Sequence, residues 1–532
     1  MLKFCFSYLK KYKINLLLYL LCVYLLSILT VINPIISGQL IDIITKSSNF
    51  ECLLFFCIIL SLSQIISIIA KYISGKKYIR IQTKSAYDMN LRLIQHVQLT
   101  PLKKIEALNP AEMTQQINND SNAVMTFVLN LMSEFPCNLF TTIFSMIILV
   151  TLNWKLSVIL FLVCIIYILI YFILRKKIYR MSYMIKQQQV SFFAVLLLQL
   201  KNIKFIKIHS LFEIFSEQIN RKFEAYFTDV LKAQKFFFGY NGLQSFIITL
   251  ANLLVFLIGG YSVMEGNMTI GKFTIIMNFF SYIIKSITYF GELGKNYQDS
   301  RVSYNRIQKI FEQKKERNGE IYLNTIDYIV CSNLSFFHQG HNVINNFCYT
   351  FKKGNMYCLV GRNGVGKTTL TNILIGLYTE QYSGIIAYND VDIRELNLYD
   401  IRKNKISVME QNIFMLDGTV KENICYLTGG NIQHIDKYLN MKAFLKDVSL
   451  DKIIYDGKGG LSGGEIQKVA FLRMISRDSD VYILDEPTSA LDKESKKMIL
   501  SCLSQLKQDR IIILISHDSD IIEEADYKIY FE

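Results

Sequence analysis

The sequence predicts a polytopic α-helical membrane domain, six transmembrane helices with cytoplasmic extensions, followed by an α/β domain of P-loop type. Long apolar runs dominate the chain as far as Gly291, and from residue 320 onward they give way to short β-rich runs that alternate with helical segments. Residues Gly361 to Thr368 read GRNGVGKT, a string that binds phosphate. Of the 532 residues, 51% are hydrophobic and 19% charged, too apolar for a soluble protein and too polar for one lying wholly in a membrane.

The membrane spans come first in the chain. A helix needs about 20 apolar residues to cross a hydrocarbon core of about 30 Å. Six segments meet this length, and we predict spans at Ile14–Ile36, Cys52–Ile73, Phe135–Leu152, Lys155–Leu174, Leu243–Met264 and Met268–Gly291.

The links between these spans predict the orientation. Short links join the first and second, third and fourth, and fifth and sixth spans, while the two other links are long and basic near the membrane, as at Arg175 and Arg180. Basic residues favour the cytoplasmic side, so we place the N-terminus and both long links in the cytoplasm. Their helical spacing predicts that the spans continue there as helices. The net charge of +14 belongs to this half of the chain, so it does not indicate nucleic-acid binding.

The domain boundary is predicted near residue 316, because the charged segment KKERNGE ends the helical pattern of the sixth span. This gives a membrane domain over residues 1–315 and a nucleotide-binding domain over residues 316–532. In the second domain MYCLV, VYILD and IIILIS lack alternation, as expected of strands buried on both faces of a mostly parallel sheet.

The string GRNGVGKT lies between a predicted strand and a predicted helix, which is the setting a P-loop requires. Its glycines let backbone N–H groups close around phosphate oxygens. Lys367 is expected to neutralise the β- and γ-phosphates, and Thr368 to offer its hydroxyl to Mg²⁺. The predicted ATP-binding residues of this loop are Gly361, Arg362, Asn363, Gly364, Val365, Gly366, Lys367, Thr368 and Thr369.

Two further motifs complete the predicted chemistry. In VYILDEP, Asp485 is expected to hold Mg²⁺ and Glu486 to orient and polarise the attacking water as a general base. In LSGGE, Ser462, Gly463 and Gly464 precede a helical run, so backbone donors and a helix N-terminus point at a bound group. One P-loop ATPase needs only one phosphate-binding string, so two of them suggest an ATP site shared between two copies.

These motifs together resemble the ATP-binding cassette (ABC) superfamily, and within it exporter half-transporters. The resemblance assigns Gln411 to the Q-loop glutamine that contacts Mg²⁺, His517 to the switch histidine that contacts the γ-phosphate, and SALD (489–492) to the D-loop. His338 stands where the family stacks a Tyr on adenine. The signature string ends in Glu465 where Gln is common.

The resemblance implies ATP-driven export of an amphipathic peptide, lipid or drug-like substrate by alternating access, with ATP and Mg²⁺ as cofactors. It implies a second half-transporter as partner, a homodimer being favoured over a heterodimer. It also implies an integral, multi-pass protein of the plasma or inner membrane with its nucleotide-binding domain in the cytoplasm. The alternative is a membrane receptor or immunity factor in which ATP turnover gates signalling. A DNA-structural ATPase is excluded, because no coiled coil separates the P-loop from the signature.

Lys285 is the exceptional charge within the spans, midway along the sixth. A charged residue at membrane depth is a functional candidate. Facing a cavity, it would favour an anionic or amphipathic cargo. It could equally extend toward the cytoplasmic interface or pair with a neighbouring residue.

Overall fold

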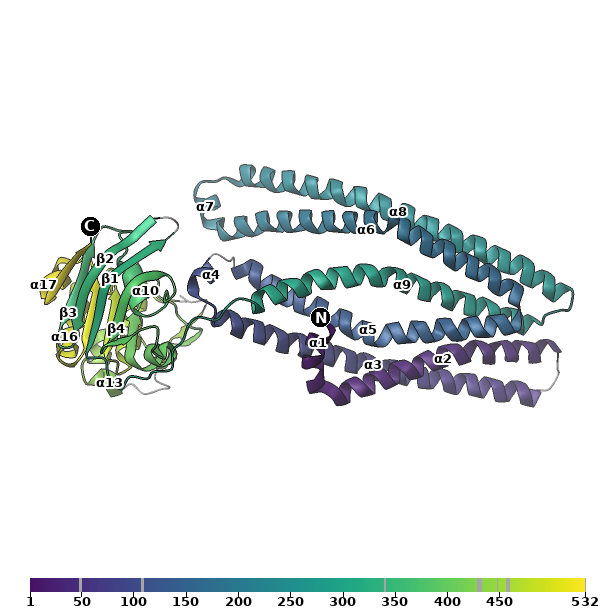
Figure 1. Cartoon of the computed structure of the whole chain (residues 1–532), viewed down its shortest axis with the longest axis horizontal. Coiled ribbons are helices and arrows are strands. Elements are labelled where there is room, and N and C mark those ends of the chain that lie inside the picture. The colour runs from purple at the N-terminus through teal and green to yellow at the C-terminus, as the bar shows by residue number, and fades with distance from the viewer. Residues whose placement is uncertain are drawn as a thin grey trace. The chain divides into compact units, whose positions relative to one another are not determined.

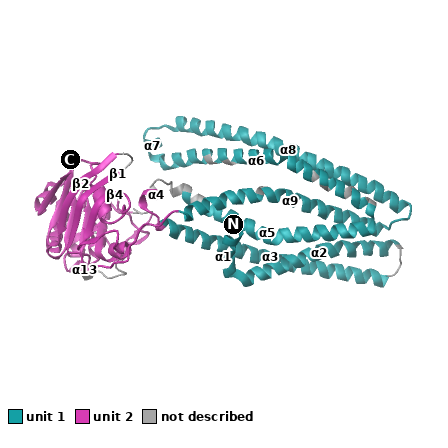
Figure 2. Cartoon of the chain, in the orientation of Figure 1, with its two compact units in different colours: residues 1–97, 109–312 teal, residues 98–108, 313–532 magenta. Residues whose placement is uncertain are grey.

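The computed structural model describes residues 1–46, 50–106, 110–338, 341–427, 433–446, 448–455 and 460–531. By their internal contacts, the residues form two units, shown in Figure 2: residues 1–97 with 109–312, and residues 98–108 with 313–532. The short helix α4 (Leu102–Glu106) therefore groups with the second unit, where Leu102 packs against buried side chains. The boundary near residue 316 between a membrane domain and a nucleotide-binding domain remains a prediction from the sequence.

The first unit is built from long helices (Figure 1). Among the described residues, six helices are long and apolar enough to cross a membrane, which confirms the predicted number of spans. Several run far beyond the length that a bilayer requires, so the long links are helical as expected. The six are α2 (Lys13–Lys46), α3 (Phe50–Gln98), α5 (Pro110–Leu152), α6 (Trp154–Lys201), α8 (Phe212–Met264) and α9 (Ile270–Phe311), with the shorter α1 (Leu2–Leu9) and α7 (Ile203–Ile208) beside them.

Polar contacts tie the long helices together at both ends. Near the C-terminus of α2 and the start of α9, the Asp42 carboxylate accepts hydrogen bonds from the Thr269 hydroxyl (2.6 Å) and the Gly271 N–H (2.8 Å). It thereby satisfies a donor at the start of α9 that has no partner within the helix. At the opposite ends of the helices, Arg306 on α9 donates two hydrogen bonds to Asp120 on α5, at 2.7 and 2.5 Å.

The second unit contains two main sheets. One is antiparallel with strand order β2-β1-β4-β5, and the other is wholly parallel with strand order β11-β3-β10-β9-β6. The antiparallel strands are β1 (Tyr328–His338), β2 (His341–Lys352), β4 (Tyr382–Tyr388) and β5 (Val391–Asp392). The parallel strands are β3 (Met356–Gly361), β6 (Ile406–Met409), β9 (Val481–Asp485), β10 (Ile511–Ile515) and β11 (Tyr527–Phe531). Two short strands, β7 (Gly418–Thr419) and β8 (Ile453–Ile454), form a separate pair.

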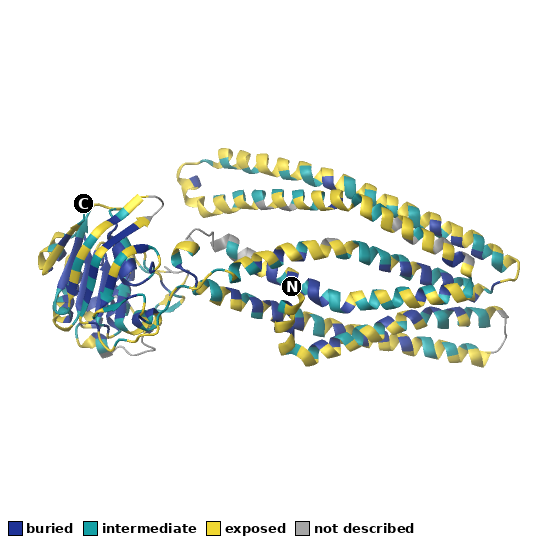
Figure 3. Cartoon of the chain, in the orientation of Figure 1, coloured by how far each residue is buried: buried dark blue, intermediate teal, exposed yellow. Residues whose placement is uncertain are grey.

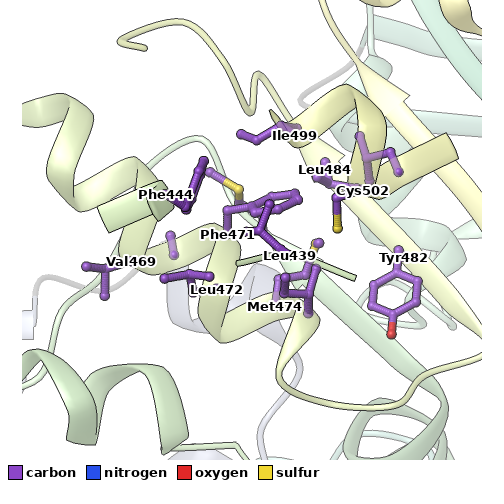
Figure 4. Close-up of a cluster of buried hydrophobic side chains, with 14 of the residues drawn as sticks. Leu439, Phe444, Val469, Phe471, Leu472, Met474, Tyr482, Leu484, Ile499 and Cys502 are labelled. Atoms are coloured by element: carbon purple, nitrogen blue, oxygen red, sulfur yellow. The ribbon is translucent and has the colours of Figure 1, made fainter. Parts of the chain in front are cut away.

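Helices cover the parallel sheet, as expected for such strands. Besides α4, the α-helices found in the described part of this unit are α10 (Lys367–Leu374), α11 (Leu398–Asp400), α12 (Val420–Cys425), α13 (Gln433–Asp436), α14 (Met441–Leu445), α15 (Gly463–Ile475), α16 (Lys493–Leu506) and α17 (Ser519–Glu524). Alternate residues of β3, β9 and β10 join two different cores: on β9, Leu484 lies in the core that contains residues of α15 and α16, and Ile483 lies in the core that contains residues of α10. Figure 4 shows the first of these cores, and Figure 3 shows the buried residues along the sheet.

The central register places the carboxyl ends of β9 and β10 side by side, because Ile515 pairs with Asp485 on one side and with Leu359 of β3 on the other. The P-loop follows β3, and residues 516–518 follow β10. Side chains that lie far apart in the sequence therefore meet at one edge of the sheet.

The Arg306–Asp120 pair gives a test of helix packing. The Arg306 side chain is half-exposed whereas that of Asp120 is almost completely buried, so removing the cation leaves a buried carboxylate without its partner. We expect Arg306→Gln to destabilise the protein by about 2 kcal/mol, and Asp120→Asn by less, because Asn keeps an acceptor without the charge. The exposed Arg301→Gln is the control. Thermal unfolding in detergent micelles measures the loss of stability in each variant. Equal effects for all three variants would contradict the expected ranking.

Candidate nucleotide site

The P-loop links β3 to α10 in a conformation that its glycines permit. Gly364 and Gly366 have φ angles of +82° and +108°, which side-chain-bearing residues rarely adopt. Gly366 also lacks room for a side chain, because a Cβ there would lie 2.7 Å from Cγ1 of Val343. The turn leaves backbone N–H groups and the N-terminus of α10 facing one concavity, an arrangement that binds anions.

Lys367 lies within the loop as a buried cation. Its Nζ donates to the carbonyl oxygens of Gly361 (2.6 Å) and Arg362 (2.9 Å) and lies 3.5 Å from Nε2 of His517. His517 Nε2 is also 3.0 Å from Oδ1 of Asn363. His517, which the family resemblance assigned to the γ-phosphate, is therefore in direct contact with the P-loop.

Asp485 at the end of β9 faces the start of α10. The Thr368 hydroxyl donates to its Oδ2 at 2.7 Å. Burial raises the pKa of the Asp485 carboxyl above its ordinary value, and the neighbouring charge of Glu486 raises it further, against the lowering effect of the Thr368 hydrogen bond. A buried anion in this position is suited to neutralisation by a cation.

Glu486 follows with a backbone φ of +50°, an unusual conformation for a residue with a side chain. Its N–H donates to the Ile515 carbonyl at 2.8 Å, and its carbonyl accepts from Nε2 of Gln467 at 2.9 Å. The hydrogen bonds on both sides hold the peptide in this strained geometry, as is common at functional sites.

One cavity of about 340 Å³ collects these groups. Its lining brings together nine of the residues predicted from the sequence, and Ile515 adds the end of β10. The lining residues are Asn363, Gly364, Gly366, Lys367, Thr368, Thr369, Gln411, Asp485, Glu486 and Ile515. Gly361 and Arg362 contribute through their carbonyls, and Val365 lies within the turn. His338 ends β1, but its side chain lies outside the described residues.

The LSGGE segment forms the start of α15. Ser462 caps the helix: its hydroxyl accepts from the Glu465 N–H at 3.3 Å, and the Glu465 carboxylate accepts from the Ser462 N–H at 2.6 Å. The second contact lowers the pKa of Glu465, so the departure from Gln keeps an ionised carboxylate turned toward its own helix cap. Gly464 lies against Ala490, whose carbonyl would be 2.7 Å from an added Cβ. None of Ser462, Gly463 and Gly464 lines the 340 Å³ cavity.

Sequence reasoning missed Gln467 on α15, a buried residue that joins three functional segments. Besides the carbonyl of Glu486, its amide contacts the Ser489 hydroxyl (2.9 Å), and its Oε1 accepts from the Ala490 N–H (2.9 Å). The only signal in the sequence was a polar residue on an otherwise apolar helix face, which is a weak indication.

In the membrane-spanning unit, Lys285 lines a separate cavity of about 230 Å³ between α2, α5 and α9. Hydroxyl and amide groups share this lining, at Ser27, Thr30, Asn138, Thr141 and Ser286. Lys285 also interacts electrostatically with Glu134 on α5. Lys285 therefore lines a cavity, and no ion pair within 4 Å joins it to Glu134 among the described residues.

The apolar helices and the P-loop site define a multi-pass membrane protein that carries an ATP-binding cassette. Residues 16–287 match the family described as the ABC transporter transmembrane region, and residues 344–489 match the family described as ABC transporter. The chain therefore belongs to the ABC transporter family, and six spans joined to one cassette make it a half-transporter.

Its relatives include two proteins named ATP-dependent lipid A-core flippase. That of Haemophilus influenzae (strain 86-028NP) is 29% identical over 276 residues, which cover 49% of this chain but only 46% of the relative, about half of its length. That of Desulfotalea psychrophila is 24% identical over 452 residues, covering 82% of this chain and 78% of the relative. The fold is similar to that of a bacterial Atm1-family ABC exporter with ATP bound, with a TM-score of 0.84 at 17% identity, covering 98% of this chain and 93% of the other.

The raised pKa of Asp485 predicts the effect of removing its charge. Above that pKa the buried carboxylate is ionised and lowers the stability of the folded state, and this cost disappears as the pH falls through the raised pKa. We expect Asp485→Asn, without nucleotide or divalent cations, to raise the unfolding midpoint of this domain by a few degrees at neutral pH, as roughly 1 kcal/mol would. The gain should shrink toward acid pH. Scanning fluorimetry in EDTA measures it, with the exposed Asp417→Asn as control, and a lower midpoint for Asp485→Asn would contradict the prediction.

Proposed function

We propose that this half-transporter hydrolyses ATP and couples the hydrolysis to export of an amphipathic substrate across the membrane. The observation that carries the proposal is the cavity that gathers Lys367, Thr368, Gln411, Asp485 and Glu486 on a chain that also has six apolar helices. The names of the relatives, ATP-dependent flippases, support the same activity.

In the proposed reaction, the P-loop binds the phosphates of ATP through its N–H groups and Lys367. The ammonium can exchange its present carbonyl acceptors, Gly361 and Arg362, for phosphate oxygens without moving far. Glu486 orients and polarises the attacking water, and its strained backbone fixes the direction from which it does so. His517 contacts the γ-phosphate, since Asn363 already holds it against the loop.

The donor groups at the site also fit Mg²⁺, which prefers oxygen ligands. The Thr368 hydroxyl and the Asp485 carboxylate lie 2.7 Å apart, and Gln411 on the same cavity brings an amide oxygen. We propose these three residues as the ones that hold the ion. When bound, Mg²⁺ neutralises the negative charge on the phosphates, which is its usual role in phosphoryl transfer.

We propose that two copies close around ATP, each P-loop meeting the Ser462–Gly464 turn of its partner. The turn supports this arrangement because it is exposed at the start of α15 and lines no part of the cavity of its own chain. A homodimer is favoured, since the chain carries every predicted catalytic group. ATP must bind the closed pair more tightly than the open one to shift the population between them.

The proposed substrate is an amphipathic molecule with an anionic group: a lipid, a peptide or a drug-like compound. The cationic Lys285 in the cavity is the reason for proposing an anionic group on the substrate, and the hydroxyl and amide groups around it offer further hydrogen bonds. The basic long links support a cytoplasmic nucleotide-binding domain and a location in the plasma or inner membrane. The receptor alternative has no observation in its favour, and an ATP-driven transport measurement separates it from export.

Replacing Glu486 tests the hydrolytic assignment. We expect Glu486→Gln to lower ATP turnover by 10²-fold or more, because general-base catalysis contributes on that order. Nucleotide binding should persist, since the variant keeps the P-loop intact. Phosphate release from the reconstituted protein measures turnover, and labelled ATP in a filter assay measures binding. The exposed Glu523→Gln on α17 is the control, and undiminished turnover in Glu486→Gln would refute the assignment.

Replacing Lys285 tests the substrate class. In nanodiscs we expect anionic amphiphiles to stimulate ATP turnover. Lys285→Gln should raise the concentration needed for half-maximal stimulation roughly tenfold, as loss of a charge-assisted contact does. Basal turnover should stay the same. Lys272→Gln, on the same helix near its outer end, is the control. In sealed vesicles, ATP-dependent movement of a stimulating ligand supports export, whereas stimulation without movement supports the receptor alternative.

A further inference from the structure

A third cavity, unrelated to the nucleotide or to Lys285, lies between α6 and α9. It measures about 590 Å³, larger than the 340 Å³ nucleotide cavity. Six residues of α6 and two of α9 line it: Tyr171, Phe172, Arg175, Lys176, Ile178, Tyr179, Gly294 and Gln298. None of these lining residues, all of which the structure describes, carries a carboxylate.

The depth of the cavity follows from the length of its two helices. Both α6 and α9 are predicted to enter the membrane from the outer side, α6 at Trp154 and α9 at Ile270. At about 1.5 Å per residue, Arg175 and Gly294 lie roughly 32 and 36 Å along their helices. A hydrocarbon core of about 30 Å ends just before them. The cavity therefore lies at the level of the cytoplasmic headgroups.

The lining combines cationic side chains with an aromatic and aliphatic wall, and a free inorganic anion would need only the cations. Arg175 and Lys176 are exposed cations, and no ion pair to either is found among the described residues. The Arg175 guanidinium lies over the Phe172 ring, 5.0 Å from its centroid, which orients it without neutralising it. Aromatic and aliphatic side chains make up most of the remaining wall. Such a surface is complementary to an anionic headgroup with the first carbons of its acyl chains.

We propose that this cavity binds the phosphodiester headgroup of an anionic phospholipid from the cytoplasmic leaflet, with Arg175 and Lys176 on the phosphate and Tyr171, one helical turn deeper in the membrane, at the glycerol level. The site is distinct from the Lys285 cavity, and the proposal rests on the membrane placement of α6 and α9 rather than on ATP turnover. Anionic lipids are abundant in cytoplasmic leaflets, and each nearby Lys or Arg strengthens their binding.

The test measures lipid selectivity in the absence of nucleotide. The full chain is reconstituted in phosphatidylcholine nanodiscs, and electron spin resonance compares spin-labelled phosphatidylglycerol with spin-labelled phosphatidylcholine at the protein surface. We expect the parent to prefer phosphatidylglycerol roughly 25-fold, since each of the two basic residues near the surface contributes about fivefold. The double variant Arg175→Gln/Lys176→Gln should lose most of this preference. Gln298→Lys, which adds a cation on the α9 wall, should increase it.

The matched control is Lys177→Gln/Arg180→Gln. These two cations lie on the same stretch of α6 but do not line the cavity, and Lys177 instead lies over the Phe236 ring of α8. The control should keep the preference. An equal loss in both double variants would overturn the proposal in favour of diffuse attraction, as would an unchanged preference in Arg175→Gln/Lys176→Gln.

Discussion

The burial of the parallel sheet on both faces is the constraint on which the nucleotide site depends. Every residue of β9 and β10 is buried, and the only charged side chain on either strand is that of Asp485, at the carboxyl end of β9. Parallel pairing then brings the ends to one edge, and β3, β9 and β10 deliver the P-loop, Asp485 and His517 there. The apolar cores are thus what position the charged groups, and the charges in turn depend on one another for neutralisation.

The membrane unit follows a different rule, because hydrocarbon offers no hydrogen bonds to exposed polar groups. Its backbone is satisfied by long helices, and several of its polar side chains form contacts between helices, both within the apolar spans and beyond them. Asp42 accepts from the start of α9, Asp120 accepts from Arg306, and the Ser286 hydroxyl donates to Asn138 beside Lys285. Each contact joins two helices that are distant in the sequence, so polar pairing specifies which helices pack together.

Much of this architecture could be predicted from the sequence. Uninterrupted apolar runs identified six spans, and the P-loop string with its flanking strand and helix identified the chemistry of the cavity. Contacts that depend on three-dimensional proximity could not be predicted, such as the amide of Gln467 between Glu486 and Ser489. The grouping of α4 with the second unit could not be predicted either. The composition of the sequence changes only near residue 316, whereas the contacts of α4 are with residues that lie more than two hundred positions later in the chain. The strained backbone of Glu486 left no trace in the residue types.

The Asp42 contact has a consequence for how the membrane unit can rearrange. By accepting from both Thr269 and Gly271, one carboxylate joins the C-terminal end of α2 to the start of α9 across more than two hundred residues of chain. Parting these ends would leave an anion near the bilayer without its two donors, which is costly. A rearrangement that moves the two ends together keeps both hydrogen bonds, whereas one that separates α2 from α9 at this point has to break both.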